Sequence, residues 1–454
     1  MVIGNFIKGI ELKNRNHYFS GICFNSSKCK KGNIFFAIEG IKINGNKFIN
    51  HAIQNGAKTI ISNQKFEGIK ENILYIRSSN VRKFLSEFAC TIYKDKPKNI
   101  IAVTGTNGKS SVSDFYFQIL RLNKKRVASI GTLGIKTQNY IKKVSNTTID
   151  PITLNIILNR LKKEKINDVI LEASSHGLKQ NRLDGLQFTT GIFTNLSHDH
   201  LDYHKTFSDY LKSKLYLFEK LLKKNANIIT DIEIPQYKRI KAIALKNKSN
   251  IETISNNGSN LEIISHEYHN EKQIIKIKYN KNIYKFETRL IGKIQIKNIL
   301  MAMIAATKSG LSFKKIINTI YNLKPVSGRL EQIGITKNNS KVILDYAHTP
   351  DALEASLNSI KEQFKKRKVS IVFGCGGDRD KAKRPMMGKI ANQYCDRIYL
   401  TDDNPRYENP KKIRTSIRKN IDKSKIYEIP NRANAIKQAI FELKTGDILI
   451  VAGK

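Results

Sequence analysis

Short apolar runs alternate with helix-like stretches through most of the chain. Between the runs lie segments whose hydrophobic residues recur with helical spacing, which is the pattern of a parallel sheet covered by helices. The last part of the chain repeats this alternation, as in a Rossmann-like sheet. We therefore predict an α/β protein. The strand-like runs are 34–38, 59–62, 100–103, 127–130, 169–171, 191–193, 341–345, 369–373, 397–400 and 447–451.

Three segments differ in pattern and predict three domains in a chain of 454 residues. The first, residues 1–96, has the pattern of a small α/β unit, and Pro97 breaks any helix and marks a linker. The second, residues 97–327, contains a central parallel sheet. Within it, period-two alternation between 251 and 290 predicts an antiparallel appendage. The third, residues 328–454, is the Rossmann-like part.

A glycine-rich turn joins the apolar run at 100–103 to a helix-like segment at 112–122. A strand, a glycine-rich turn and a helix in this order form a context in which backbone N–H groups and a helix N-terminus hold phosphates. Lys109 would reach the terminal phosphates of a nucleoside triphosphate, and the Ser110 hydroxyl would bind Mg²⁺. A plain strand-to-helix turn is the alternative. The residues concerned are Thr104, Gly105, Thr106, Asn107, Gly108, Lys109, Ser110 and Ser111.

The formal charge is +42, from 80 Lys and Arg against 38 Asp and Glu. Such a charge often indicates nucleic-acid binding, but here the lysines are spread along the whole chain without an aromatic-interleaved basic patch. We attribute the charge to AT-rich codon bias and expect no nucleic-acid partner. No apolar stretch approaches the roughly 18 residues of a membrane helix, and no signal-peptide pattern begins the chain. We expect a cytoplasmic protein without membrane insertion.

The five cysteines contain no Cys-x-x-Cys pair. We interpret them as free thiols of a reducing compartment, because neither a zinc site nor a disulfide framework fits their number and spacing.

Candidate metal ligands follow two of the strand-like runs. Glu172 ends the run at 169–171, and a carboxylate at the C-terminal edge of a parallel strand faces the ligand crevice, so it is a candidate Mg²⁺ ligand. A capping or salt-bridging role is the alternative. Three histidines and two aspartates lie within 198–204. They leave a zinc site open, although a magnesium–nucleotide site needs only one or two protein ligands. Lys214 has the pattern of an ordinary helical lysine.

Taken together, these motifs resemble those of the Mur ligases, which add amino acids to the peptidoglycan precursor. The resemblance covers nearly the whole chain, and its motifs follow the order of the family. Within the family, the match is to the ligases that add meso-diaminopimelate, through Asp402-Asp403-Asn404-Pro405-Arg406. The other matching segments are 104–111, 146–148, 172–182, 197–218, 328–331, 345–350 and 374–388.

The resemblance implies an amide ligase that uses ATP and Mg²⁺ and works through an acyl phosphate. It implies that Lys214 reacts with carbon dioxide to form a carbamate, which is an anion and can hold Mg²⁺. Ser110, Glu172 and His200 would be the other magnesium ligands. The implied catalytic residues are Lys109, Lys214, Glu172 and His200, and further nucleotide contacts are implied at Asn298, Arg329, Asp345 and His348.

The resemblance also implies two further substrates, UDP-N-acetylmuramoyl-L-alanyl-D-glutamate and meso-diaminopimelate. An arginine would pair with the distal carboxylate of diaminopimelate, and a site built for that carboxylate would reject lysine, which lacks it. The residues implied for diaminopimelate are Arg379, Asp403, Asn404, Pro405, Arg406 and Gly453. Those implied for the UDP-muramoyl dipeptide are Ser26, Asn146, Thr147, Thr148, Ser175, Gln180 and Arg182.

The chain departs from the family pattern at Asn25-Ser26-Ser27 and at Ile294-Gln295. At its end the family continues past Lys454 with Gly-His-Glu, so we expect the third domain to be truncated. A lysine-adding ligase of the same family and a non-catalytic ATP-binding remnant remain alternatives. Folylpolyglutamate synthase is a weaker one, because the first domain and the Asp403–Arg406 motif would have no purpose. We expect a monomer.

Overall fold

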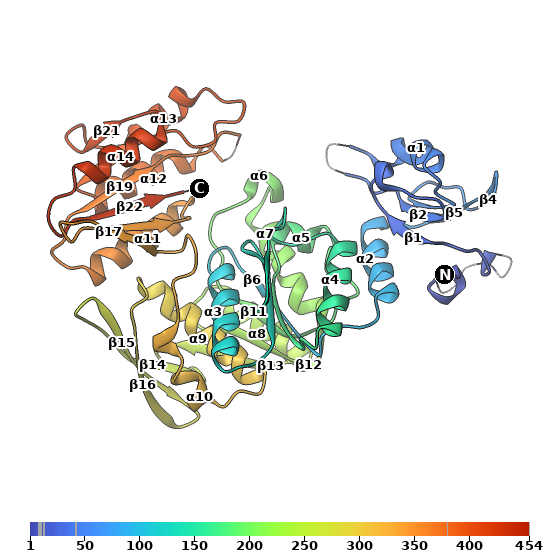
Figure 1. Ribbon diagram of the computed structural model, residues 1–454, viewed down its shortest axis with the longest axis horizontal. Coiled ribbons are helices and arrows are strands. Elements are labelled where there is room, and N and C mark those ends of the chain that lie inside the picture. Colours follow the sequence, from blue (N-terminus) through green and yellow to red (C-terminus); the bar gives the residue numbers. More distant parts are fainter. Residues whose placement is uncertain (8–10, 12–13, 41–42, 379, 454) are drawn as a thin grey trace. The chain divides into compact units, whose positions relative to one another are not determined.

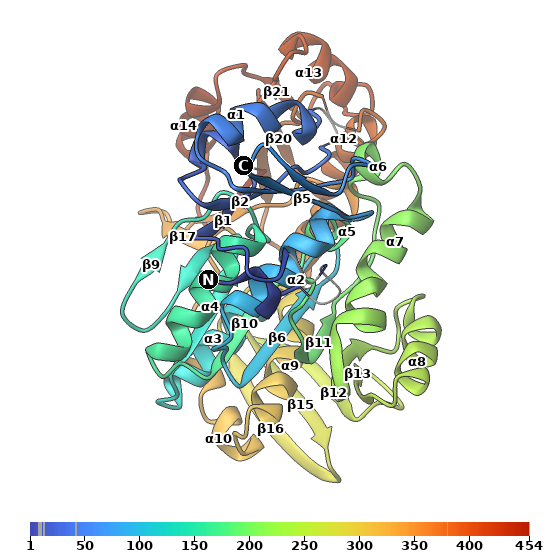
Figure 2. The ribbon, with the colours of Figure 1, turned by 90° about the vertical axis from the view of Figure 1, so that its right-hand side faces the viewer.

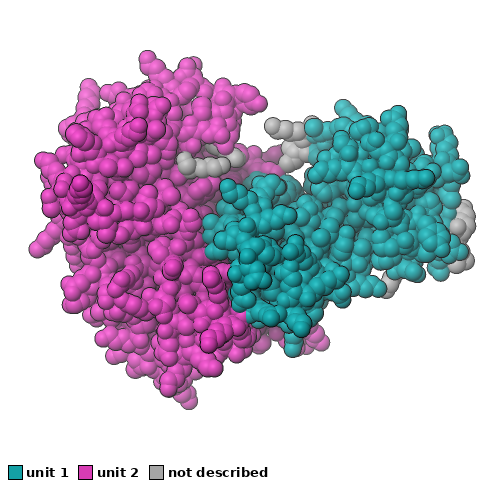
Figure 3. Space-filling view, in the orientation of Figure 1, with its two compact units in different colours: residues 1–102, 126–189, 216–223 teal, residues 103–125, 190–215, 224–454 magenta. Residues whose placement is uncertain are grey.

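The computed structural model describes residues 1–7, 11, 14–40, 43–378 and 380–453. In this part of the chain the strands form three parallel-rich sheets, of five, eleven and six strands, joined by helices (Figure 1, Figure 2). The predicted α/β class is confirmed. Figure 3 distinguishes two compact units: unit 1 comprises residues 1–102, 126–189 and 216–223, and unit 2 comprises residues 103–125, 190–215 and 224–454.

Unit 1 contains the five-stranded sheet, in the order β1-β2-β3-β5-β4. The first four of these pair in parallel, with Ile34 opposite Thr59, and β4 adds an antiparallel edge. Phe36 and Phe88 lie at the centre of its core, with their ring centroids 5.8 Å apart. The elements are β1 (Gly21–Cys23), β2 (Asn33–Phe36), α1 (Ile49–Gln54), β3 (Thr59–Ser62), β4 (Gly68–Lys70), β5 (Ile73–Arg77) and α2 (Val81–Ile92).

Two cysteines of this sheet correct the sequence prediction. Cys23 ends β1, and Cys29 follows the short 3-10 helix η3 (Ser26–Lys28). Their Cα atoms lie 5.9 Å apart, and the structure joins them in a disulfide. The prediction of free thiols was wrong here, because the helical turn brings two residues six positions apart in the chain to the same place.

Unit 1 also contains part of the middle segment. Strand β7 (Val127–Gly131) pairs in parallel with β10 (Asp168–Glu172), and β8 (Gly134–Lys136) and β9 (Ile141–Lys142) extend β7 in antiparallel fashion. Helix α4 (Pro151–Lys163) begins after an Asp150 cap, and α5 (Ser175–Lys179) begins after a Ser174 cap. Glu172 therefore stands at the C-terminal end of a buried strand.

The remaining elements of the middle segment include the strand and helix that flank the glycine-rich turn. Helix α3 begins at Lys109, three residues earlier than the apolar pattern predicts. The elements are β6 (Asn99–Thr104), α3 (Lys109–Leu122), β11 (Phe188–Phe193), α6 (Leu201–His204), α7 (Phe207–Tyr216), the π-helical turn η5 (Leu217–Leu221), β12 (Leu222–Asp231), α8 (Tyr237–Lys246), β13 (Asn250–Ser255), β14 (Leu261–His269), β15 (Lys272–Tyr279), β16 (Asn282–Thr288), α9 (Lys293–Lys308) and α10 (Phe313–Ile317).

The period-two region is only partly antiparallel. Strands β14, β15 and β16 pair in antiparallel fashion, as predicted, but β13 pairs in parallel with both β12 and β14. The side-chain oxygen of Asn260 accepts hydrogen bonds from the N–H and the hydroxyl of Thr253, at 2.9 and 2.8 Å. These bonds hold a loop that returns the chain in the same direction, which hydrophobic alternation does not reveal.

Unit 2 also contains the six-stranded sheet, in the order β17-β18-β22-β19-β20-β21. All neighbours in it pair in parallel except β17 and β18. Its functional loops follow the carboxyl ends of parallel strands, where ligands bind in such sheets. The elements are β17 (Glu331–Ile335), β18 (Lys341–Asp345), α11 (Pro350–Gln363), β19 (Val369–Phe373), α12 (Lys383–Tyr394), β20 (Arg397–Leu400), α13 (Pro410–Arg418), β21 (Ile426–Glu428), α14 (Arg432–Phe441) and β22 (Ile448–Ala452).

Candidate active site

The glycine-rich turn of unit 2 has a backbone that requires glycine at two positions. Gly105 has φ +147°, and a Cβ atom there would lie 1.9 Å from the Thr194 hydroxyl oxygen. Gly108 has φ +85°, and a Cβ atom there would lie 2.6 Å from Oδ1 of Asn298. L side chains rarely adopt these conformations. Asn195 holds the turn, since its side-chain oxygen accepts the N–H of Asn107 at 2.9 Å.

Two lysines converge on one carbonyl oxygen in this turn. Lys109 Nζ donates to the carbonyl oxygen of Gly105 at 2.8 Å and to that of Thr106 at 2.7 Å. Lys214 Nζ donates to the same Gly105 oxygen at 2.7 Å. The Lys214 side chain is 1% exposed and lies beneath the ring of Tyr210, 4.5 Å from its centroid. Burial, reinforced by the charge of Lys109, lowers the pKa of Lys214 well below its usual value.

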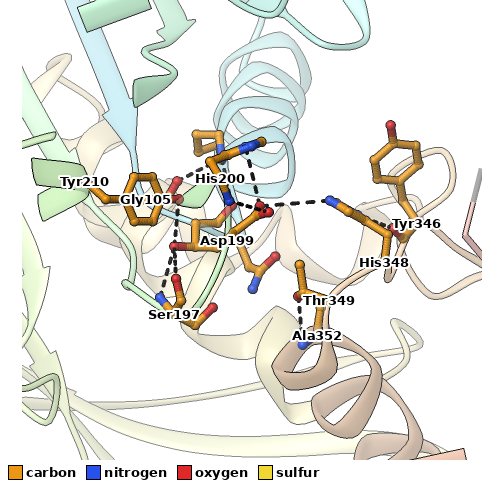
Figure 4. Close-up of polar contacts among 12 residues, drawn as sticks. Gly105, Ser197, Asp199, His200, Tyr210, Tyr346, His348, Thr349 and Ala352 are labelled. Carbon is orange, nitrogen blue, oxygen red and sulfur yellow. Dashed lines mark hydrogen bonds and ion pairs between the residues drawn. The ribbon is translucent and has the colours of Figure 1, made fainter. Parts of the chain in front are cut away.

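Asp199 is the acidic centre of the neighbouring loop (Figure 4). Its carboxylate lies 3.4 Å from Nε2 of His200 and 3.9 Å from Nε2 of His348. Burial raises the pKa of Asp199, but His200, His348 and Lys109 outweigh it and hold that pKa below the usual value. Burial lowers the pKa of His348, against the attraction of Asp199. His200 adopts φ +55°, in the left-handed region.

A first cavity of about 250 Å³ adjoins the glycine-rich turn. We call it the loop cavity. Asp345 lies on its wall, and its carboxylate accepts the N–H groups of Leu330 and Ala347 at 2.8 and 2.7 Å. The guanidinium of Arg329 stacks on the ring of Tyr346, 4.8 Å from its centroid. Six residues predicted for nucleotide binding line this cavity: Asn107, Gly108, Ser111, Asn298, Arg329 and Asp345.

A second cavity, of about 230 Å³, is lined by His198 and His200, the two histidines that flank Asp199 in the chain. We call it the histidine cavity. His348, predicted as a nucleotide contact, lines this cavity together with His200. His198 pairs with Asp380 across 2.7 Å. The predicted amino-acid motif contributes Asp403, Asn404 and Arg406 to the same wall. Arg379 lies outside the described residues.

An ion pair between the buried Arg384 and the partly exposed Glu408 lies beside the amino-acid motif. Arg384 donates from Nη1 and Nη2 to the two carboxylate oxygens of Glu408, at 3.0 and 2.8 Å. The hydrogen bonds from Arg384 come first among the causes that lower the pKa of Glu408 to about 2. Arg406 Nη1 donates to the carbonyl of Gly377 at 2.6 Å, and the N–H of Gly377 donates to the carbonyl of Asn404 at 2.9 Å. The loops after β19 and β20 are thus tied to each other.

Unit 1 gathers a second group of predicted residues. The Glu172 carboxylate accepts the N–H and the hydroxyl of Thr132 at 2.9 and 3.1 Å, and Thr132 bonds Thr147 at 3.0 Å. The Thr148 hydroxyl donates to the Glu172 carbonyl at 2.9 Å. Arg182 donates to the Thr148 carbonyl at 2.6 Å. Gln180 accepts two further bonds from the guanidinium of Arg182, and Ser175 is buried at the start of α5.

Two other predicted residues of unit 1 have local partners. Ser26 is 6% exposed, and its hydroxyl lies 3.0 Å from Nδ1 of His51. Asn55 donates to the Ser26 carbonyl at 3.0 Å. The amide of Asn146 donates only to the neighbouring Ser145 hydroxyl, at 3.3 Å, among the bonds found in the described chain.

Comparison with known proteins gives the family of this arrangement. Family models described as the Mur ligase family catalytic domain, the Mur ligase middle domain and the Mur ligase glutamate ligase domain match residues 18–93, 103–306 and 328–454. The chain belongs to the Mur ligase family.

Relatives and a solved structure agree with this assignment. The UDP-N-acetylmuramoyl-L-alanyl-D-glutamate–2,6-diaminopimelate ligase of Rickettsia rickettsii is 40% identical over 445 residues, which are 97% of this chain and 91% of that protein. The ligase of the same name from Rhizobium meliloti is 38% identical, over 96% of this chain and 88% of that protein. A solved structure of that name is 30% identical, with a TM-score of 0.74, and covers 100% of this chain and 93% of its own.

The Mur ligase assignment confirms the resemblance seen in the motifs. The protein is an ATP-dependent, ADP-forming amide ligase, and Mur ligases generally use Mg²⁺. Three of the four predicted magnesium ligands, Ser110, His200 and Lys214, lie in unit 2, and Glu172 lies in unit 1. In the described residues, no three His, Cys, Asp or Glu side chains gather as a metal site. The described part of the chain contains no helix long and apolar enough to cross a membrane.

The sequence analysis noted Asp199 only as part of the cluster at 198–204, and it missed other residues that this Mur ligase brings to its site. Tyr210 covers Lys214, and its hydroxyl lies 3.0 Å from that of Thr106. Arg384 and Glu408 are 24 residues apart, and nothing in their local patterns links them.

Proposed function

We propose that this Mur ligase adds meso-diaminopimelate to UDP-N-acetylmuramoyl-L-alanyl-D-glutamate. The observation that carries the proposal is the histidine cavity, because the Asp403, Asn404 and Arg406 loop shares its wall with His200. An amino acid held by that loop would have its amine near His200 and Asp199, which lie beside the glycine-rich turn. The names of the relatives support the same substrates.

The proposed roles of the three domains follow the segments of the chain. Residues 1–96 would bind the uridine nucleotide, residues 97–327 would bind ATP, and residues 328–454 would bind the amino acid. In the first domain, the buried Ser26 would contact the uridine part. In the second, Asn146, Thr147, Thr148, Ser175, Gln180 and Arg182 would grip the muramoyl dipeptide, and the Arg182 guanidinium suits a carboxylate or a phosphate.

The reaction would begin with attack of the D-glutamyl carboxylate on the γ-phosphorus of ATP. The bond to the β,γ-bridging oxygen breaks, and ADP leaves. Lys109 would offset the charge that gathers on the phosphoryl oxygens. The neutral amine of diaminopimelate then attacks the acyl phosphate, which gives the amide and phosphate and releases one proton. The loop cavity would hold the adenosine through Asn298, Arg329 and Asp345.

Lys214 is proposed to work as a carbamate. A carbamate forms only from the neutral amine, and the depressed pKa of Lys214 favours that form. Lys109 and Lys214 share the Gly105 oxygen, which brings two ammonium groups close together, and reaction of the neutral Lys214 amine with carbon dioxide would replace one of these positive charges with a negative one. The carbamate and the Ser110 hydroxyl would supply oxygen donors of the kind that Mg²⁺ prefers, and Glu172 and His200 are the other predicted ligands. When bound, the ion would neutralise phosphate charge.

An ADP-release assay tests the proposal. The full chain, Mg-ATP and the uridine dipeptide are supplied with meso-diaminopimelate or with L-lysine, and reactions without amino acid serve as the control. We expect ADP release that depends on the dipeptide and prefers diaminopimelate. Preference for lysine would identify a lysine-adding ligase, and ATP binding without ADP release would identify a non-catalytic protein.

We propose that the enzyme acts as a cytoplasmic monomer, which size-exclusion chromatography and cell fractionation would test.

A further inference from the structure

Arg432 lies near Asp403 of the amino-acid motif. It is the first residue of α14, and its Nη2 donates to the carbonyl oxygen of Ala452 at the end of β22, at 2.9 Å. The next residue is Gly453, with φ +91°. A Cβ atom on Gly453 would lie 3.6 Å from Oδ2 of Asp403 and 3.9 Å from Nη2 of Arg432. Arg432, Asp403 and Gly453 therefore lie close to one another.

One nitrogen of Arg432 is unused. Nη1 is buried and has no hydrogen-bond partner among the described residues. Burial lowers the pKa of Arg432, against the attraction of Asp403, but an arginine stays charged at neutral pH. Native structures rarely leave a buried donor without an acceptor, so this donor calls for an explanation. Arg414 is a contrast, because its guanidinium is paired with Asp402 and Glu428.

We infer that Arg432 is a carboxylate contact for the amino-acid substrate, with Nη1 as the donor. The inference rests on the proposed function. Asp403 and Arg432 offer one negative and one positive group side by side, which matches an ammonium and a carboxylate on one carbon. Diaminopimelate has two such ends. The reacting end must present a neutral amine, whereas the other end keeps both charges, so Asp403 and Arg432 suit the non-reacting end.

This assignment predicts a specificity role. Lysine carries an ammonium at the non-reacting end but lacks the carboxylate there. Arg432 would thus bind diaminopimelate and leave lysine untouched, and with Arg406 it would contribute to the choice between the two.

The test compares Arg432→Gln and Arg432→Lys with wild type in the full chain. Arg418→Gln is the control, because Arg418 is half exposed and pairs only with Glu428 in the described structure. Arg432→Gln should raise the KM for meso-diaminopimelate by about 10- to 100-fold, the range for a lost charge-assisted bond. The KM for ATP and the slow turnover of lysine should not change. Arg432→Lys should recover part of the loss, and it provides the measurement should the Gln variant fail to fold.

Calorimetry separates this inference from the proposed function. Meso-diaminopimelate is titrated into each protein loaded with Mg²⁺ and a non-hydrolysable ATP analogue. Weaker binding by Arg432→Gln alone supports the inference, even if wild type releases no ADP. Three results would overturn it: unchanged binding in the variant, an equal loss with lysine, or no binding of meso-diaminopimelate by wild type.

Discussion

Replacement of Lys214 by alanine tests the central electrostatic feature of the site. Its nitrogen and that of Lys109 lie 2.7 and 2.8 Å from one oxygen, so they are at most about 5.5 Å apart. At an effective dielectric constant of about 20, two positive charges at that distance repel by about 3 kcal/mol. The proposed carbamylation would turn this repulsion into an attraction of similar size. Loss of such an aligned charge should reduce kcat by about 10²- to 10³-fold.

The assay for Lys214 measures ADP release, with Lys212→Ala as the control. Lys212 lies on the same helix and is exposed, so its variant should keep full activity. In Lys214→Ala, short carboxylic acids such as formate or acetate should restore part of the activity, because they can occupy the position of the carbamate. Labelling with ¹³C-bicarbonate should give a carbamate signal in wild type and none in this variant.

Acidity gives a second measurement of the same feature. The pKa of Lys214 is depressed, so the neutral amine is the form present above that lowered value. As the pH falls through it, the amine becomes protonated and carbon dioxide is lost. In carbon dioxide-free buffer, bicarbonate should restore the activity. The activity restored in this way should decline as the pH is lowered. Full activity of Lys214→Ala, or wild-type activity that does not depend on carbon dioxide, would refute the proposal that Lys214 works as a carbamate.

Three other predictions follow from individual contacts. Gly108→Ala should raise the Kd for Mg-ATP more than tenfold by calorimetry, whereas Gly446→Ala, with a similar φ of +80° but open space around it, should leave it unchanged. Glu408→Gln should raise the KM for the amino acid about 5- to 50-fold with the KM for ATP constant, and a parallel rise in both would contradict a positioning role. Phe88→Ala should lower the free energy of unfolding by about 3–5 kcal/mol in denaturant titrations, with the exposed Phe66→Ala as control.

Sequence patterns predicted those features of the fold that depend on neighbouring residues. The glycine-rich turn is the clearest case, because its backbone requires glycine at two positions three residues apart in the chain. Most predicted strands appear within one or two residues of their expected ends. The parallel pairing of β13 with β14 was not predictable, because a side-chain bond between Asn260 and Thr253 sets the direction of the loop. The Cys23–Cys29 pairing likewise depends on a local helical turn.

The site residues divide along the same line. Asn298, Arg329 and Asp345 come from distant segments, and only the resemblance to Mur ligases could name them before the fold was known. The loop cavity brings them together. The burial of Lys214 was even harder to predict, since the same helix carries the exposed Lys212 two residues earlier, on nearly the opposite face. No periodicity distinguishes a lysine under a tyrosine ring from one in solvent.

The charge of a buried lysine depends on its tertiary neighbours, and at Lys214 those neighbours act in opposite directions. Burial and Lys109 lower its pKa, whereas Asp199 raises it. The Gly105 carbonyl accepts hydrogen bonds from both ammonium groups but carries no negative charge to offset them, and the Asp199 carboxylate already faces His200 and His348. A buried cation that lacks its own counter-ion costs free energy unless it loses its charge or changes sign. In the proposed mechanism Lys109 offsets phosphate charge and stays positive, so Lys214 is the lysine that would lose its charge. Conversion of Lys214 to a carbamate would remove the repulsion from Lys109. In the unmodified protein, the lowered pKa of Lys214 favours the neutral amine, which is the form that would react with carbon dioxide.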